Sequence, residues 1–137
     1  MHAFIIGHWY LFLALFVVLG LIVIQPVLDA ASGIQKVSSQ EAVQLINRQG
    51  GVVLDVREAA EFQSGHIPRA INIPLGEVMS RGPELKKFKE RPVIICCASG
   101  SRSARAAAVL KKDGFTSVHN LAGGVSAWRS HNLPIES

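Results

Sequence analysis

The hydrophobic and polar positions divide the chain into two parts. Residues 3–24 contain no Asp, Glu, Lys or Arg, and Asp29 is the first charged side chain. As an α-helix with about 1.5 Å of rise per residue, this run extends roughly 33 Å, which is enough to cross a hydrocarbon core. Trp9 and Tyr10 suit one membrane interface, and Gln25 and Pro26 mark the far end. The pattern predicts one transmembrane helix over about residues 5–25.

A cleaved signal peptide and a buried core helix are the alternatives to an anchor. A signal peptide carries Lys or Arg before a shorter apolar core, whereas residues 1–8 contain neither, although LDAAS at 28–32 resembles a weak cleavage site. A core helix is shorter and shows a polar face. We therefore favour an uncleaved membrane anchor over residues 1–29, followed by one domain over residues 30–137 that begins with a short linker, AASGIQ.

The positions of the basic residues predict the orientation of the span. No Lys or Arg precedes it, whereas Lys36 follows roughly 12 residues beyond its end, within the range where the positive-inside tendency operates. Cys96 and Cys97 are the two cysteines, and neighbours in sequence make a poor disulfide, so both thiols suit a reducing compartment. We expect the C-terminal domain to lie in the cytoplasm.

The net charge of the domain limits the classes of binding partner that we expect. The whole chain has a net charge of +4, and residues 30–137 hold all 14 basic and nine of the ten acidic side chains, which makes the domain +5. This excess favours anionic lipid headgroups or small anions. Nucleic acid is not expected, because no basic stripe with interleaved aromatic residues occurs. No Cys/His spacing indicates a metal, and we expect no cofactor.

Strand-like apolar runs alternate with helical patterns beyond the anchor. The predicted strands cover residues 34–37, 52–56, 70–73, 92–97 and 117–121. The predicted helices and helical turns cover residues 38–49, 57–65, 75–80, 83–89, 101–113 and 123–130. Strands that alternate with helices pair in parallel and are covered by helices on both faces. The pattern predicts an α/β fold with a parallel five-stranded sheet.

The segment from Cys97 to Arg102, with the sequence CASGSR, follows the fourth predicted strand and precedes a helix. Open α/β sheets bind ligands at this position. Small residues and Gly100 allow the backbone N–H groups to converge on one point, and the helix N-terminus adds a partial positive charge. Such a loop stabilises both an anion and a thiolate, and lowers a cysteine pKa below about 8.5.

The two cysteines have different predicted roles. Successive strand residues face opposite sides, so Cys96 and Cys97 cannot both point into the loop. Cys97 opens the loop and is the predicted nucleophile. Cys96 belongs to the apolar run and is predicted to be a small buried hydrophobe, with a resolving thiol for oxidised Cys97 as the alternative.

The polar residues of the loop are candidate anion ligands. Arg102 can offer a guanidinium fork to an oxyanion, whereas Arg105, one helical turn further on, is predicted to be a surface charge. Ser99 and Ser101 are equally consistent with hydroxyl donors to a substrate and with small loop and helix-cap residues. Phosphate and a sulfur species are the two anions to consider.

The spacing of the loop is Cys-x4-Arg. Cysteine-dependent phosphatases have a loop one residue longer, usually with histidine before the cysteine, where this chain has Cys96. The shorter loop encloses a smaller cavity, suited to one sulfur atom attached to the cysteine. LDVREAAEFQSGHIPRAINIP at 54–74 closely resembles the upstream signature of the rhodanese, or sulfurtransferase, family, and GGVSAWRSHNLPI at 123–135 resembles its C-terminal signature. Three such motifs in order, over about residues 34–135, are a specific signal.

The resemblance carries further expectations. An N-terminal span before one such domain is similar to the membrane-anchored rhodaneses of Gram-negative bacteria, which implies a single-pass protein of the inner membrane. Arg69 stands where the family most often has glycine, and SHNLP lacks the usual glycine before Leu-Pro. We expect these departures to affect local turns rather than the chemistry.

The resemblance implies a persulfide mechanism. Cys97 would take a sulfane sulfur from thiosulfate or a persulfide donor and pass it to cyanide, a thiol or a sulfur-carrier protein. The substrate-binding residues would be Ala98, Ser99, Gly100, Ser101 and Arg102. Asp55 and Arg57 are expected to be structural, with the aspartate tying loops together. His66 is expected to be a turn residue and Trp128 to be core packing.

Two other functions compete with this hypothesis. The domain could be a weakly active or non-enzymatic interaction module that docks an inner-membrane partner, because fold alone does not establish activity. A small phosphatase or arsenate reductase is disfavoured by the loop length. The loop ends in Ser-Arg rather than the Val-Thr of mercaptopyruvate-using enzymes, which favours thiosulfate or a protein persulfide as donor.

Overall fold

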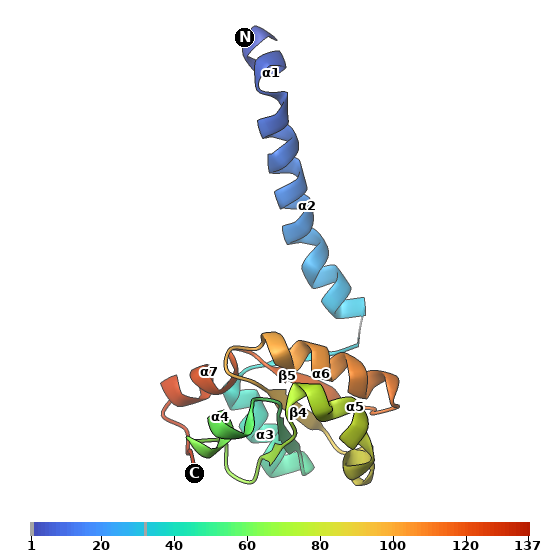
Figure 1. Cartoon of the computed structure of the whole chain (residues 1–137), viewed down its shortest axis with the longest axis vertical. Helices are drawn as coiled ribbons and strands as arrows, with labels where there is room; N and C mark the ends of the chain where they lie inside the picture. The colour runs from blue at the N-terminus through green and yellow to red at the C-terminus, as the bar shows by residue number, and fades with distance from the viewer. Residues whose placement is uncertain (1, 32) are drawn as a thin grey trace. The chain divides into compact units, whose positions relative to one another are not determined.

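The computed structural model describes residues 2–31 and 33–137. The chain divides into two compact units, Met1–Ser32 and Gly33–Ser137. The first unit is helical, with α1 (His2–Gly7) followed by α2 (Trp9–Ala31) (Figure 1). The second unit contains all five strands found in the described residues.

The N-terminal unit provides one helix that is long and apolar enough to cross a membrane. Its apolar window is Trp9–Leu28, 20 residues with a mean hydropathy of 2.8 and none of it buried among the described residues. The window begins and ends later than the predicted span of about 5–25. The chain turns at His8, and α2 continues through Pro26, which lacks the N–H that would bond to the carbonyl of Ile22 but does not end the helix.

Helix α2 extends into the linker predicted at residues 30–35. Ala30 and Ala31 are still helical, Ser32 lies outside the described residues, and β1 begins at Gln35. The boundary at residue 29 between an anchor and a domain stays a prediction.

The second unit is built on a five-stranded sheet, as predicted. Its strands are β1 (Gln35–Val37), β2 (Val52–Asp55), β3 (Ile71–Asn72), β4 (Val93–Cys96) and β5 (Val118–Leu121). Their order is β1-β5-β4-β2-β3, and every pairing is parallel. The order places β4 at the centre of the sheet, between β5 and β2, so the segment after β4 emerges in the middle of the carboxyl edge.

The helices follow the predicted order. They are α3 (Ser39–Gln49), α4 (Ala59–Gln63), α5 (Val78–Arg81), α6 (Ser101–Lys112) and α7 (Gly124–Ser130), with 3-10 turns η1 (Leu75–Glu77) and η2 (Gly82–Phe88). Ser38 caps α3, because its Oγ accepts a hydrogen bond from the Glu41 N–H at 3.1 Å. Gly50 ends the helix in the left-handed conformation, with φ +68°.

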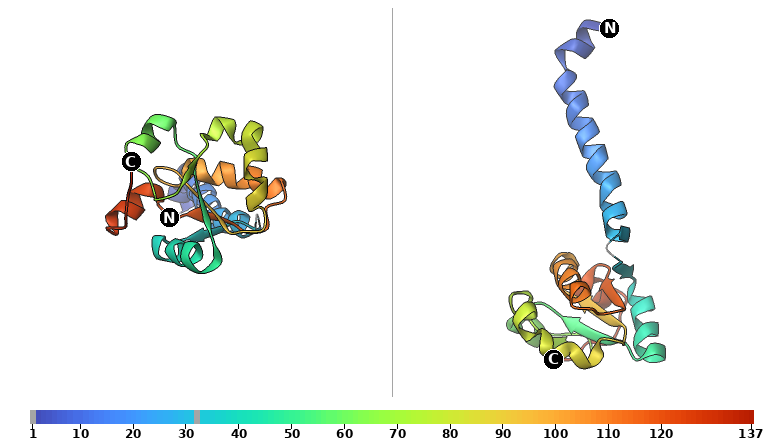
Figure 2. Two further views of the ribbon diagram at one scale, coloured as in Figure 1. Left: turned by 90° about the horizontal axis from the view of Figure 1, so that it is seen from below. Right: turned by 90° about the vertical axis from the view of Figure 1, so that its right-hand side faces the viewer.

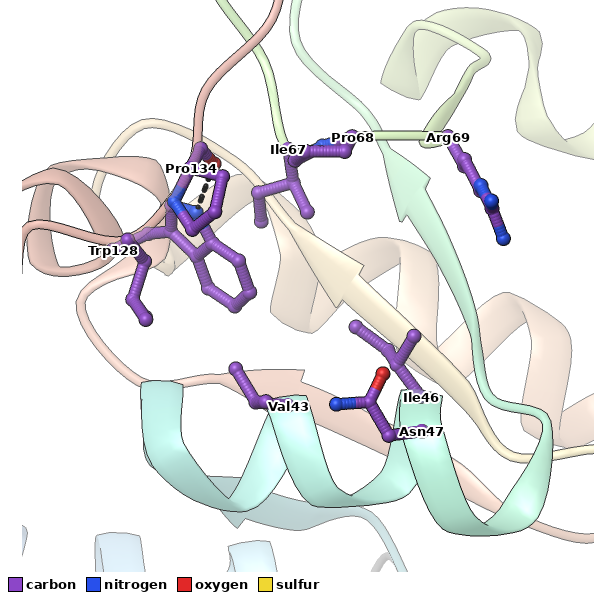
Figure 3. A pocket seen from close by; sticks show the side chains of 9 residues that line it. Val43, Ile46, Asn47, Ile67, Pro68, Arg69, Trp128 and Pro134 are labelled. Carbon is purple, nitrogen blue, oxygen red and sulfur yellow. Dashed lines mark hydrogen bonds between the residues drawn. The ribbon is translucent and has the colours of Figure 1, made fainter.

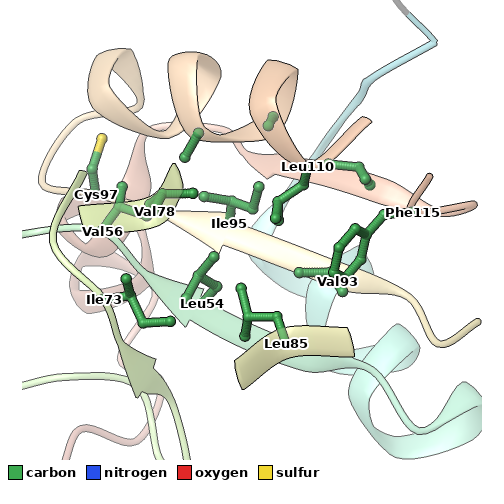
Figure 4. Packing of buried hydrophobic residues seen from close by; sticks show 13 residues of the cluster. Leu54, Val56, Ile73, Val78, Leu85, Val93, Ile95, Cys97, Leu110 and Phe115 are labelled. Carbon is green, nitrogen blue, oxygen red and sulfur yellow. The ribbon is translucent and has the colours of Figure 1, made fainter. Parts of the chain in front are cut away.

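Helices cover both faces of the sheet (Figure 2). On one face, Leu54 and Ile95 pack with Leu85 of η2 and Leu110 of α6, and Figure 4 shows Cys97 at one end of this cluster. On the other face, α3 and α7 contribute the buried side chains Ala42, Val125 and Trp128, which pack with Val53, Ile94 and Cys96. Two apolar clusters enclosing a parallel sheet are the arrangement that the near-continuous apolar strands require.

The two positions that depart from the family pattern both have left-handed backbone. Arg69 has φ +64° and Asn132 has φ +57°. Glycine is favoured at such positions because a side chain crowds the following carbonyl, and asparagine tolerates them better than most residues. The chain therefore keeps both turns with non-glycine residues.

Candidate active site

Cys97 lies directly after β4, and α6 begins at Ser101, so the intervening loop curls over the carboxyl end of the central strand. Gly100 has φ +109°, a conformation that a side chain would strain. Cys97 packs in the cluster under α6, whereas Cys96 packs in the cluster on the opposite face. The two cysteines therefore face opposite sides of the sheet, as their alternation in a strand predicts.

The Cys97 sulfur is held by hydrogen bonds from the loop and from α6. The Gly100 N–H donates to Sγ at 3.0 Å, and Sγ lies 3.5 Å from the Oγ of Ser103, to which the thiol donates. Ser103 is buried, and its hydroxyl donates to Oδ1 of Asn120 on β5 at 2.6 Å. This chain of contacts fixes the sulfur at the inner end of the loop, where Cys97 is 1% exposed.

The surroundings shift the pKa values of the two thiols in opposite directions. Burial acts to raise the pKa of Cys97, but the hydrogen bonds of the Ser103 side chain and of the Ser103, Gly100 and Ser99 backbone outweigh it, so that this pKa is lowered. Burial raises the pKa of Cys96 well above its ordinary value, and the charge of Asp55 raises it further. Cys97 is thus the thiol that ionises more readily, and Cys96 is a buried apolar group.

The N-terminus of α7 holds the other side of the loop. The Val125 N–H donates to the Cys97 carbonyl at 2.8 Å, and the Ser126 N–H donates to the Ala98 carbonyl at 3.2 Å. Gly124 makes this approach possible, since a Cβ at that position would overlap the Cys97 carbonyl oxygen and the Ala98 backbone. With those carbonyls turned to α7, the N–H groups that follow are free to face the sulfur.

Arg102 is paired with a carboxylate from α4. Its Nη1 donates to Oε1 of Glu61 at 2.7 Å and its Nη2 donates to Oε2 at 2.9 Å. The pair is partly exposed, with 34% of the arginine and 38% of the glutamate side chain accessible. Hydrogen bonds from Arg102 lower the pKa of Glu61 to about 2, which keeps it ionised at neutral pH. Sequence reasoning expected the Arg102 fork to be directed at a substrate, and did not identify Glu61 as its partner.

The remaining candidate loop residues lie on the solvent side. Ser99 and Ser101 are exposed, and Ala98 and Gly100 are half-buried. Arg105 is exposed, in accord with its expected role as a surface charge.

Asp55 and Arg57 form a buried ion pair beside the site. Arg57 Nη2 donates to Oδ2 of Asp55 at 2.7 Å and to the Gly65 carbonyl at 2.9 Å. Asn72 Nδ2 donates to the Asp55 and Arg57 carbonyls at 3.0 and 2.9 Å. The cluster joins the end of β2 and the residues after it to Gly65 after α4 and to Asn72 of β3, so its geometry is that of a structural tie.

His66 and Trp128 have structural contacts. The His66 backbone pairs with that of Glu136 in an antiparallel bridge, and its ring stacks on Phe62 with centroids 3.7 Å apart. Trp128 is buried in the core, and its Nε1–H donates to the Pro134 carbonyl at 2.8 Å. Among residues 2–31 and 33–137, no group of three or more His, Cys, Asp or Glu side chains could hold a metal ion.

An apolar groove of about 430 Å³ lies apart from the cysteine loop. Figure 3 shows Val43 and Ile46 of α3 across from Trp128, Pro134 and Ile67. The lining includes no residue of the segment 97–102, so the groove is separate from the candidate chemistry.

Sequence reasoning missed Ser103, Asn120 and Glu61 as parts of the site. Asn120 carried a signal, since it is a polar residue in a buried strand beside β4. Ser103 also carried one, as it lies three residues after Gly100 and so returns beneath the loop on the first helical turn. Glu61 is 41 residues from Arg102, and no local pattern indicates their contact.

Comparisons with known proteins agree with this geometry. Residues 38–131 match the model of the rhodanese-like domain family. The chain is 37% identical over 105 residues to an uncharacterized protein of Escherichia coli K12, YibN, across 76% of this chain and 73% of that protein. It is 38% identical over 108 residues to a protein of Allochromatium vinosum named sulfurtransferase, across 79% of this chain and 92% of that one.

A solved structure supports the same assignment. The crystal structure of a rhodanese-related protein from Thermoplasma volcanium superposes with a TM-score of 0.67 at 29% identity, covering 74% of this chain and 97% of that one. The parallel sheet order, the cysteine loop after the central strand and the family match together show that this chain belongs to the rhodanese-like domain family.

Proposed function

We propose that the protein is a membrane-tethered sulfurtransferase that moves a sulfane sulfur through a persulfide on Cys97. The observation that carries the proposal is the Cys97 sulfur, which has a lowered pKa and accepts a backbone hydrogen bond inside a loop that leads into α6. A thiolate in an N–H-rich loop is a nucleophile next to an anion site. Relatives named thiosulfate sulfurtransferase support this chemistry for the chain.

The first half-reaction loads the enzyme with sulfur. The Cys97 thiolate attacks the outer sulfur of thiosulfate, a new S–S bond forms, and the bond to the sulfonate sulfur breaks. Sulfite leaves with the electron pair, so the charge of thiolate plus thiosulfate equals that of persulfide anion plus sulfite. With a persulfide donor, R–S–SH, the products are the Cys97 persulfide and the thiol R–SH.

The second half-reaction unloads it. The Cys97 persulfide adds an S–S bond of about 2.05 Å beyond a buried Sγ, which carries the terminal sulfur outward to the acceptor. Cyanide takes this sulfur to give thiocyanate and the free thiolate, whereas a thiolate acceptor and one proton give a new persulfide. The loop N–H groups would stabilise the terminal sulfur anion between the two steps.

The apolar helix Trp9–Leu28 supports attachment to a bilayer, and the absence of Lys or Arg before it supports a cytoplasmic domain. We assign the protein to a bacterial inner membrane as a single-pass protein. A thiol or sulfur-carrier protein would be the acceptor, and tethering favours an acceptor or partner at the membrane surface.

The test is the intact mass of the full-length protein in detergent after incubation with thiosulfate, followed by cyanide. We expect a gain of one sulfur atom that cyanide removes. Cys97→Ser should lose the adduct, and Cys96→Ser is the matched control that should keep it. If no adduct forms with thiosulfate or with a persulfide donor, the sulfurtransferase proposal fails and a docking module becomes the better account.

A further inference from the structure

The ion pair between Glu61 and Arg102 lies at the exposed side of the cysteine loop. Both terminal nitrogens of Arg102 donate to the two oxygens of Glu61, at 2.7 and 2.9 Å. Arg102 lies in the first turn of α6, directly after the loop that begins at Cys97, and is the cation nearest in sequence to the nucleophile. The Glu61 carboxylate therefore neutralises the positive charge of Arg102, which would otherwise attract an anionic donor.

The other nearby arginines do not supply a replacement positive charge at the entrance of the cysteine loop. Arg57 is buried and paired with Asp55 at 2.7 Å, and Arg105 is exposed one helical turn further along α6. A donor reaches the buried sulfur from the solvent side, where Ser99, Ser101 and the ion pair lie. The sulfonate half of thiosulfate carries its charge on that side and leaves as a dianion.

Donors differ in how much charge they bring to this entrance. Thiosulfate has two negative charges, and its sulfite leaving group keeps both. Cysteine persulfide is a zwitterion with at most one net negative charge, and its leaving group is a single thiolate. A carboxylate at the entrance opposes the approach and release of a dianion more strongly than those of a singly charged donor.

Resting on the proposed function, we infer that Glu61 is a specificity residue that directs the enzyme away from dianionic thiosulfate and toward persulfide donors. It acts through charge, by neutralising Arg102 at the loop entrance. Removal of the charge would free the guanidinium to bind sulfonate oxygens and to stabilise the departing sulfite.

The experiment compares two donors on the same preparation of full-length protein in detergent. We measure kcat/KM for thiosulfate and for cysteine persulfide, with cyanide as acceptor, and take their ratio. In Glu61→Gln the ratio should rise about fivefold at low ionic strength in favour of thiosulfate, and the gain should shrink as salt screens the charges. Because both donors are measured on one preparation, partial loss of folded protein cancels in the ratio.

Two variants separate charge from structure. Glu61→Asp keeps the charge, and its ratio should stay close to that of the wild type. Glu84→Gln removes a more exposed carboxylate, 55% accessible against 38% for Glu61, that pairs with Arg81 at 2.7 Å, and so controls for net charge and for loss of an arginine pair. Its ratio should not change.

The outcomes separate this inference from the function on which it rests. An unchanged or lower ratio in Glu61→Gln would show that Glu61 holds Arg102 in place and would overturn the inference alone. Failure of the wild-type protein to take sulfur from either donor would overturn the proposed function, and the inference with it.

Discussion

The Cys97 sulfur owes its predicted reactivity to a few short contacts. Gly100 donates to it from the loop, and Ser103 links it to Asn120 on the neighbouring strand. These contacts oppose a burial that would otherwise favour the neutral thiol. Because burial and these few hydrogen bonds together set the pKa of Cys97, replacing a single side chain should change that pKa measurably.

Ser103→Ala should raise the pKa of Cys97. The Ser103 hydroxyl accepts from the neutral thiol, but it can turn to donate to the thiolate, and the variant removes this second hydrogen bond. We expect alkylation of Cys97 by iodoacetamide to slow by about fivefold at pH 7, the effect of one hydrogen bond worth about 1 kcal/mol. The pH–rate curve should move to higher pH, and the two rates should converge well above both pKa values. The measurement uses a Cys96→Ser background, with Ser99→Ala as the exposed control; an unshifted curve would contradict the assignment.

Arg69→Gly should stabilise the protein, because Arg69 has φ +64° and glycine adopts this conformation without crowding. The gain is about 0.5–1 kcal/mol, since the greater freedom of glycine in the unfolded chain offsets part of the relief. The backbone N–H of residue 69, which donates to Glu136 at 2.9 Å, is retained. Thermal unfolding of the full-length protein measures the effect, and Arg69→Ala, which keeps a Cβ, should show no such gain.

At the scale of elements, three helices and two strands contribute to the surroundings of the cysteine loop. Cys97 follows β4, β5 contributes Asn120, and α6 contributes Ser103. Helix α7 binds the carbonyls of Cys97 and Ala98, and α4 brings Glu61 to Arg102. Gly124 of the C-terminal motif lets α7 approach the loop backbone directly, whereas a Cβ at Gly123 would overlap Ala127 of the same helix.

Gly124→Ala should displace the cysteine loop, because the added Cβ would overlap the Cys97 carbonyl oxygen at a residue with φ +59°. We expect a loss of at least about 2 kcal/mol in stability, from overpacking and backbone strain, and a fall of tenfold or more in sulfur transfer, since small displacements of a nucleophile are costly. Gly76→Ala is the matched control, as a Cβ there meets nothing within 4 Å. Equal activity of the two variants would exclude the proposed role of Gly124.

At the scale of the whole molecule, the two units carry different properties. Residues of the first unit give one apolar helix, and those of the second give the family fold with the cysteine loop. The proposed sulfur transfer belongs to the second unit, and the proposed attachment to a membrane belongs to the first.

Membrane attachment predicts that Val18→Arg with Leu19→Arg moves the protein to the soluble fraction. The two positions lie near the middle of Trp9–Leu28, where each charge costs about 2.5–3.5 kcal/mol of insertion free energy. Carbonate-washed membranes, probed for the protein, measure the effect, and Val18→Ala with Leu19→Ala should stay in the membrane. A fluorescent protein fused after Ser137 should fluoresce and an alkaline phosphatase should be inactive there; the reverse result would place the domain outside the cytoplasm.

The sequence by itself determined the fold class, the five strands, the apolar helix and the different surroundings of the two cysteines. These follow from local patterns, because the period of apolar residues and the alternation along a strand depend on near neighbours. The ends of the apolar helix were less well determined, since a proline does not always end a helix and α2 continues past Pro26.

Only the tertiary structure decided which residues surround the loop. Glu61 meets Arg102 across 41 residues, and Asn120 meets Ser103 across 17, through the packing of α4 and β5 around the carboxyl end of β4. No periodicity or spacing in the sequence indicates either contact, because both depend on the order of the strands in the sheet. The sequence therefore predicted Cys97 as the nucleophile, whereas the side chains that contact Cys97 and Arg102 emerged from the order β1-β5-β4-β2-β3 and the helices packed on it.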